Sequence, residues 1–336
     1  MRARIVQGST LLAAALTACF WTSLVSAEDQ VPMLTPDGYP TVDGSTSTQP
    51  LGVLLACRLT QTAFAWGSRP FDGTRRLYPT TQTYDPLTRL SLDFPAARFY
   101  MPTNIHQTLA GRIQHHGTHE SYTNLITGLA NLIVAAREPS EDELRMAEDR
   151  GVHIRWKPIA LDAFVFIVNT NNPVATLTVE QIRTIYTGAI TNWEQVGGPS
   201  AALNAYQRNR NSGSQEKMEK LVMKGLKMIA PRDLEVPISM IGPFNALRRD
   251  KNGLGYTVQY YDTHMTRIPE VKLIAVNGVE PSAKNIRERR YPFVSEVVVA
   301  WLDNLPAGSA AELVRNWILS DEGRQIVQES GYVPLK

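Results

Sequence analysis

The apolar run at residues 159–168 constrains the fold of this chain more than any other segment. Every residue in the run except Asp162 is hydrophobic. A short run of this kind, without polar alternation, is typical of a strand that is buried on both faces. Similar runs alternate with segments of helical periodicity along the chain. The sequence therefore predicts an α/β fold in which helices cover both faces of a sheet.

The first 27 residues predict a secretory signal peptide. Arg2 and Arg4 precede an apolar run that ends in small residues at Ser26 and Ala27. We expect cleavage after Ala27 and a mature protein that is periplasmic or secreted. A lipobox-like sequence ends at Cys19, but the residues after it stay apolar, which favours cleavage near Ala27 over a lipid anchor.

The mature chain is predicted to be nearly neutral. Removing residues 1–27 takes away two arginines from the 34 basic residues, which leaves 32 basic residues against 32 acidic ones. A neutral protein has no global field that attracts nucleic acid or an anionic membrane, so an anion must be bound by local donors. Cys57 is then the only cysteine, which excludes an intramolecular disulfide, and its apolar surroundings indicate a core residue.

A short helix with clear ends is predicted after residue 177. Thr178 can cap it through its hydroxyl, and Gln181 can complete a capping box. Gly188 lies where a left-handed residue ends a helix. The apolar face has helical spacing and consists of Ile182, Ile185 and Tyr186.

Residues 177–198, LTVEQIRTIYTGAITNWEQVGG, closely resemble the second domain of phosphate-type substrate-binding proteins of bacterial ABC importers. The resemblance covers nearly all of the mature chain and is weakest over residues 67–103 and 230–250. It implies a type II periplasmic-binding-protein fold with two lobes, each a mixed sheet flanked by helices, joined by two hinge crossings. Lobe 1 would comprise residues 28–160 and 266–336, and lobe 2 residues 161–265.

Three segments carry further structural expectations. A helix is predicted from Pro50 to about Trp66, because proline is favoured at the first helical position. Residues 67–103 are rich in Pro, Thr and Arg and predict a long surface insertion. A helix from Gln215 to about Ile229 is expected to expose one lysine face to solvent. That face consists of Lys217, Lys220, Lys224 and Lys227.

An oxyanion receptor of this family needs many convergent donors, because a buried anion must be hydrogen-bonded. Backbone N–H groups at helix N-termini can supply them. Three loop-to-helix junctions rich in Gly and hydroxyl residues occur at residues 44–47, 117–118 and 212–214. Each alone is also explained by ordinary helix capping, so their joint occurrence carries the prediction.

The resemblance implies which residues bind the anion. Residues 44–51, GSTSTQPL, are similar to the family segment G-S-T-x-x-x-P-L, and residues 208–214, RNRNSGS, to R-x-x-x-S-G-T. Arg208 would supply a charged guanidinium from the second lobe. Thr118 would take the hydroxyl position of the family's G-S segment. The other implied ligand residues are Ser45, Thr46, Ser47, Ser212, Gly213 and Ser214.

Arg137 marks a departure from phosphate-specific members, which place an acidic residue after this strand to accept a phosphate proton. Arg137 is predicted either to join the anion site, as in relatives with Ser-Arg here, or to form a surface ion pair with Glu138 or Glu141. With Arg137 in the site, discrimination between phosphate and sulfate is in doubt. Glu120 could restore an acceptor or could face solvent.

The predicted function is capture of inorganic phosphate or a similar oxyanion by an exported monomer, which delivers it to an inner-membrane ABC permease. No catalytic residue, cofactor or metal is expected. The H-H-x-x-H pattern of His115, His116 and His119 resembles a metal site, but two of these residues are expected in a loop, which argues against metal binding. The rival functions are a secreted phosphatase on the same scaffold and a cell-surface or signalling module that has lost tight binding.

Overall fold

The computed structural model describes residues 33–69, 73–83, 102–231, 234–236, 239–266 and 268–335. These residues all belong to one compact unit, Pro32–Lys336. The predicted signal peptide and Cys19 lie outside the described residues, as do residues 70–72 and 84–101 of the predicted insertion. The predicted division into two lobes, with boundaries at residues 160 and 265, stays a prediction.

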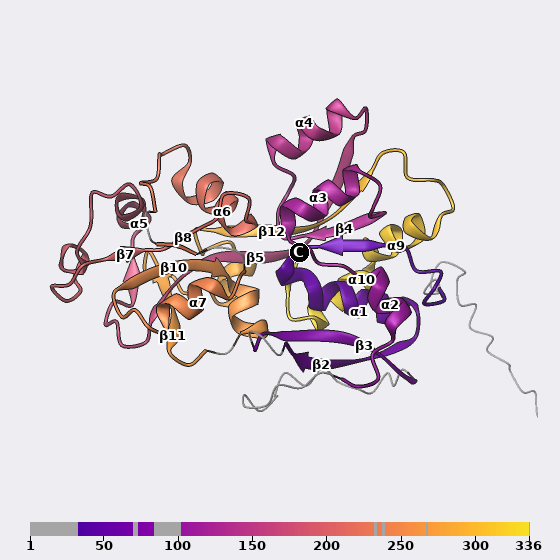
Figure 1. Ribbon diagram of the computed structural model, residues 1–336, viewed down its shortest axis with the longest axis horizontal. Coiled ribbons are helices and arrows are strands. Elements are labelled where there is room, and N and C mark those ends of the chain that lie inside the picture. Colours follow the sequence, from indigo (N-terminus) through magenta and orange to yellow (C-terminus); the bar gives the residue numbers. More distant parts are fainter. Residues whose placement is uncertain are drawn as a thin grey trace, which may run out of the picture. The chain divides into compact units, whose positions relative to one another are not determined.

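A mixed sheet of nine strands is the centre of the described fold (Figure 1). Its main path has the order β1-β4-β12-β5-β10-β7, in which β1 and β4 are parallel and β5 is antiparallel to both β12 and β10. The strands of this path are β1 Val42–Gly44, β4 Leu132–Ala135, β12 Val294–Leu302, β5 Ile154–Asn169, β10 Gly253–Val258 and β7 Asn204–Ala205. The other three strands of this sheet are β11 Val271–Val276 and β13 Val333–Pro334, which pair with β5, and β6 Thr176–Leu177, which pairs with β11.

Strand β5 contains the predicted apolar run and belongs to both halves of the sheet. Residues 154–163 of β5 pair with β12, whereas residues 164–168 pair with β10. All residues of β5 from Ile159 onward are buried. The predicted buried strand is therefore confirmed, although it begins five residues earlier than the apolar run.

Helices cover both faces of the sheet, as Figure 1 shows for α1 and α10 on one side of β4 and α3 and α4 on the other. Because successive side chains of a strand point to opposite faces, Leu132 and Val134 lie in one core cluster and Ile133 and Ala135 in another. The helices are α1 Gln49–Leu59, α2 Gln107–Arg112, α3 Thr118–Ile126, α4 Glu141–Asp149, α5 Val179–Tyr186, α6 Gly213–Lys217, α7 Gly242–Leu247, α8 Ala283–Arg287, α9 Ala310–Ile318 and α10 Asp321–Glu329. The 3-10 and π-helical turns whose residues the structure describes in full are η1 Thr46–Thr48, η2 Trp193–Val196, η3 Met218–Met223 and η5 Tyr261–Met265.

The predicted short helix is confirmed as α5, with its capping box. The Gln181 amide donates to Thr178 Oγ1 at 3.1 Å, and the Thr178 amide donates to Gln181 Oε1 at 2.8 Å. Gly188 has a positive φ of 87° and ends the segment. The predicted apolar face is buried, and so is Cys57, as expected of a core residue.

The predicted helix from Pro50 to Trp66 is wrong beyond Leu59. Helix α1 ends there, and strand β2, Thr62–Ser68, pairs antiparallel with β3, Arg75–Thr83. Residues 62–66 include threonine and two aromatic residues, which favour a strand once a partner is present. That partner comes from the predicted surface insertion, whose described part is mostly buried.

The predicted lysine-faced helix is also shorter than expected. Helix α6 ends at Lys217 and continues as the π-helical turn η3, which ends where Lys224 takes a positive φ of 47°. Lys217 is only 3% exposed, so its assignment to a solvated face is wrong. The other three lysines of this stretch are exposed.

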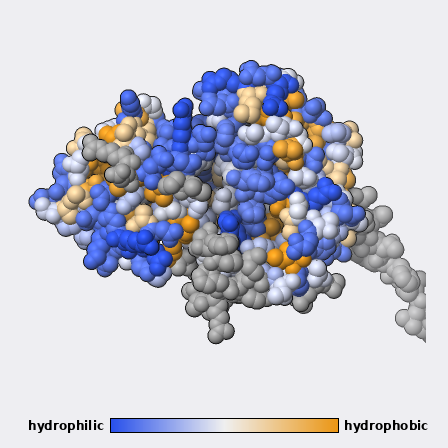
Figure 2. Space-filling model, in the orientation of Figure 1, coloured by the Kyte–Doolittle hydropathy of each residue, from blue (hydrophilic) through white to orange (hydrophobic). Residues whose placement is uncertain are grey.

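Polar side chains cover most of the face shown in Figure 2, and its apolar residues occur in small groups. Among the described residues, the large exposed hydrophobic side chains are Met33, Leu129, Leu226, Ile229 and Leu313, of which only Leu226 and Ile229 are close together in the chain. No helix in the described part of the chain combines the length and the apolar character needed to cross a membrane.

Candidate anion-binding site

A cavity of about 550 Å³ lies where the three predicted loop-to-helix junctions meet. One side of it is formed by residues at the starts of η1 and α3, and another by residues at the start of α6. The structure brings together eight of the nine predicted site residues in its lining, which are Ser45, Thr46, Ser47, Thr118, Arg208, Ser212, Gly213 and Ser214. Their role as ligands stays a prediction.

The first junction is held in place by the close approach of β1 and β4. A Cβ on Gly44 would lie 2.5 Å from the Val134 carbonyl oxygen, so only glycine allows this approach. Ser45 then leaves the strand, and its Oγ accepts a bond from the Ala136 amide at 2.8 Å. The same Oγ lies 2.7 Å from Thr118 Oγ1, which joins the first junction to the second.

The second and third junctions touch at Thr118 and Gly213. A Cβ on Gly213 would lie 2.5 Å from Thr118 Oγ1, so the N-terminal ends of α3 and α6 are in close contact. Ser212 caps α6, because its Oγ accepts a bond from the Gln215 amide at 3.0 Å. The first amides of both helices have no partner within the helix and point toward the positive end of its dipole. The arrangement therefore suits a small anion.

Arg208 is a buried cation whose described partners are all neutral. Arg208 is 7% exposed and lines the cavity. Nε donates to the Val236 carbonyl at 3.2 Å, and the Arg208 backbone amide donates to the Tyr256 hydroxyl at 2.9 Å. Burial lowers the pKa of Arg208, against a smaller opposite effect of Tyr256. Within the described residues no carboxylate pairs with Arg208. Because a buried charge is costly without a counter-charge, the site is suited to bind an anion from solution.

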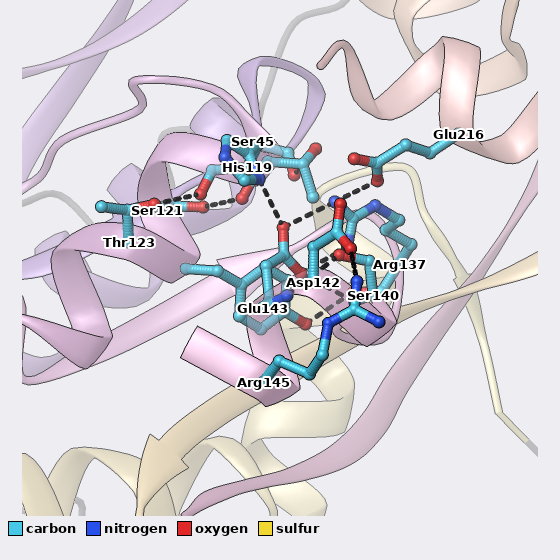
Figure 3. Close-up of polar contacts among 12 residues, drawn as sticks. Ser45, His119, Ser121, Thr123, Arg137, Ser140, Asp142, Glu143, Arg145 and Glu216 are labelled. Carbon is cyan, nitrogen blue, oxygen red and sulfur yellow. Dashed lines mark hydrogen bonds and ion pairs between the residues drawn. The ribbon is translucent and has the colours of Figure 1, made fainter. Parts of the chain in front are cut away.

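Arg137 does not line this cavity, which differs from its predicted place in the anion site. Its guanidinium donates two bonds of 2.8 Å to the carboxylate of Glu143, whose side chain is fully buried (Figure 3). It also pairs with Glu216 of α6. Arg137 lies outside the cavity because successive side chains after β4 point to opposite faces. Ala136 lines the cavity, whereas Ala135 and Arg137 point to the face that α3 and α4 cover. The alternative prediction, an ion pair, is right in kind. Its partners are Glu143 and Glu216, however, and not Glu138 or Glu141.

The three histidines of the H-H-x-x-H pattern all line the cavity, but His116 and His119 have different hydrogen-bond partners. His116 Nδ1 lies 2.9 Å from Asp43 Oδ2, and His119 Nδ1 lies 3.1 Å from Glu143 Oε1. His115 lines the cavity, and burial together with the Arg76 charge lowers its pKa to about 3.

Possible metal ligands do gather at His119, Glu143 and Glu216, whose ligand atoms lie within 4.8 Å of one another. Figure 3 shows the guanidinium of Arg137 among them, paired with both carboxylates. A permanently charged group therefore already occupies the place where a cation would bind.

Sequence reasoning missed several residues of the cavity. Lys217 lines it, and its Nζ donates to Ser295 Oγ at 2.8 Å. Burial lowers the pKa of Lys217 to about 8, and the Asp162 carboxylate opposes this effect. The sequence did contain a signal for the position of Lys217. Lys217 follows Ser214 by three residues, so the two side chains lie on the same face of the helix. The other missed residues, for which no sequence signal was available, include Gln49, Arg76, Tyr78 and Tyr261.

Comparisons with known proteins place this chain by its sequence and its fold. The phosphate-binding protein PstS of Staphylococcus epidermidis is 26% identical over 224 residues, which cover 65% of this chain and 67% of that protein. Two solved structures share the fold. A putative phosphate ABC transporter substrate-binding protein with bound phosphate from Clostridium perfringens has a TM-score of 0.60 at 22% identity and covers 88% of this chain and 98% of its own. An ABC-type phosphate transport receptor from Vibrio cholerae has a TM-score of 0.57 at 20% identity, with coverages of 88% and 99%.

These neighbours confirm the predicted α/β class, with a mixed sheet flanked by helices as in type II periplasmic binding proteins. The family described as "PBP superfamily domain" matches residues 103–322. Because this match spans more than half of the 336 residues, the chain belongs to the PBP superfamily.

Proposed function

We propose that this protein is an exported solute-binding protein that captures inorganic phosphate or a similar oxyanion for an ABC importer. The observation that carries the proposal is the buried Arg208, which faces a cavity lined by hydroxyl groups and helix N-termini and has no described carboxylate partner. The names of the relatives, phosphate-binding protein and phosphate transport receptor, support phosphate as the anion. The same proposal includes cleavage of the signal peptide near Ala27, a periplasmic or secreted location, action as a monomer and delivery of the anion to a permease.

The proposed mechanism is closure of the segment 161–265 onto the rest of the chain around a bound anion. Contacts between these parts support it, because Gly213 meets Thr118 and Glu216 pairs with Arg137. Anion ligands from both parts can be satisfied together only in the closed form, so the ligand shifts the population toward that form. No covalent step is required, and the Ser212 hydroxyl is already used as a helix cap.

Isothermal titration of the mature protein, stripped of bound anion, tests the proposal. We expect heat on addition of phosphate and saturation at one phosphate per chain. Chloride at the same ionic strength serves as the control for nonspecific screening. Absence of binding to phosphate, sulfate and other oxyanions would reject the transport function, and steady hydrolysis of a chromogenic phosphate ester would favour the phosphatase instead.

The Gly213→Ala variant is expected to bind phosphate more weakly by about 1–3 kcal/mol, the usual range for overpacking. The new Cβ would lie 2.5 Å from Thr118 Oγ1 and would separate the two helix N-termini. Gly111→Ala is the matched control, because nothing lies within 4 Å of a Cβ at that position. Titration calorimetry of both variants measures the effect, and equal affinities would show that the contact at Gly213 does not matter for binding.

Affinity for phosphate is expected to fall as the pH rises through about 8, the pKa to which burial lowers Lys217. Below this pH Lys217 is charged and adds to the positive potential of the cavity, whereas above it the amine is neutral. The Lys217→Gln variant lacks this titration. The ratio of the Kd of the variant to that of the wild type, which cancels the ionisation of phosphate itself, should therefore decrease between about pH 7 and about pH 9.5. A constant ratio would exclude Lys217 from anion binding.

A further inference from the structure

The cavity is larger than a tetrahedral oxyanion needs. Its volume of about 550 Å³ falls among pockets that take small organic ligands, roughly 300–1,000 Å³. Phosphate has five heavy atoms and replaces only a few waters of about 30 Å³ each. Separation of the two sides at the predicted phosphate-binding junctions does not account for the difference, because Gly213 already touches Thr118 and Lys217 Nζ lies 2.8 Å from Ser295 Oγ. The additional space therefore lies beyond those junctions.

Strand β3 forms one wall of this additional space. Gln49 at the start of α1 fixes the strand, because its side-chain amide donates to the Leu77 carbonyl and its Oε1 accepts the Leu77 amide at 3.1 Å. Leu77 is fully buried in the core, so the alternation along the strand turns Arg76 and Tyr78 to the other face, and both line the cavity. Arg76 Nη1 also donates to the Thr46 carbonyl at 3.2 Å, which joins β3 to the first junction.

The remaining lining combines apolar and aromatic surface with polar groups, which include the charged side chains of Arg69 and Glu120 and three histidines. Met240, Val258 and Tyr261 contribute the apolar and aromatic part. The neutral polar part consists of the side chains of Gln49, Asn209, Asn211 and Ser239. An inorganic anion makes no use of apolar walls, whereas a small organic group with several hydroxyls can pack on the aromatic rings and bond to the amides.

We propose that the cavity binds a phosphate monoester of a hydroxyl-bearing organic group, such as a sugar or polyol phosphate. The phosphoryl group occupies the three junctions beside Arg208, and the organic group lies between Tyr78 of β3 and the side chains of Met240 and Tyr261. This inference rests on the proposed function, because the phosphoryl group uses the same anion site.

Titration calorimetry of the anion-stripped protein with phosphate, glycerol 3-phosphate, glucose 6-phosphate and uncharged glucose tests the inference. At least one of the two monoesters should bind ten-fold or more tightly than phosphate, and glucose should not bind. Phosphate binding as tight as or tighter than both monoesters would overturn the inference and leave the proposed function intact. Binding of none of the phosphates would overturn both.

Two variants in the cavity lining, one in β3 and one just before α7, test the place of the organic group. In Tyr78→Ala and in Met240→Ala, the affinity for the preferred monoester should fall at least five-fold more than the affinity for phosphate. Thr81→Ala is the control on the same strand, since Thr81 is exposed and outside the cavity lining, and it should change neither affinity. A monoester preference that survives in both wall variants would overturn the assignment of this space.

Discussion

The Arg208→Ala variant is expected to lose about 2–5 kcal/mol of phosphate binding energy, which raises Kd roughly thirty-fold to several thousand-fold. The reason is that Arg208 is buried, lines the cavity and lacks a described carboxylate partner, so the bound anion is its counter-charge. Titration calorimetry measures the loss. Arg208→Lys keeps the charge but not the planar fork of donors, and an intermediate affinity is expected for it.

Two controls separate binding from folding in this experiment. Arg210→Ala removes an exposed arginine two residues away, which is outside the cavity lining, and should bind as the wild type does. Without ligand, Arg208→Ala should be no less stable than the wild type, because the substitution removes a buried charge that lacks a counter-ion. Its Tm should then fail to rise on addition of phosphate. A normal phosphate-induced rise would show that Arg208 is not the anion-binding cation.

The Glu143→Ala variant is expected to lower the free energy of unfolding by about 3–5 kcal/mol, since it breaks a buried ion pair and leaves Arg137 with only the partly exposed Glu216 as a partner. Glu143 is fully buried and accepts two bonds from Arg137 and one from the Ser140 amide, so α4 also loses its capping box (Figure 3). Urea denaturation of the mature protein measures the change. Glu141→Ala, at an exposed position of the same helix, is the matched control.

A double replacement tests whether the charge or the packing is responsible. The Arg137→Met/Glu143→Leu variant removes both charges and should recover much of the stability lost in Glu143→Ala. If Glu143→Ala stays within about 1 kcal/mol of the wild type, the ion pair is not a stabilising element, because ordinary surface substitutions also fall in that range.

Local features of the sequence predicted elements and junctions well. The capping box of α5 depends on residues three apart, and the burial of β5 depends on its own apolar run. The meeting of Ser45, Thr118 and Ser212 at one cavity was expected from the family resemblance rather than from the residues alone. The resemblance did not predict where the side chain of Arg137 lies. That position depends on the alternation of side chains after β4 and on the ion pair with the buried Glu143.

By itself, the sequence determined the α/β class, the caps of the helices and the hydroxyl-rich junctions, because these depend on residues close together in the chain. Only the tertiary structure showed that β2 and β3 pair, that Arg76 and Tyr78 line the cavity and that Lys217 is buried. Each of these depends on contacts between distant segments, such as Gln49 with Leu77 and Lys217 with Ser295. Residue type sets which groups can bind an anion, but long-range packing sets which of them face the cavity.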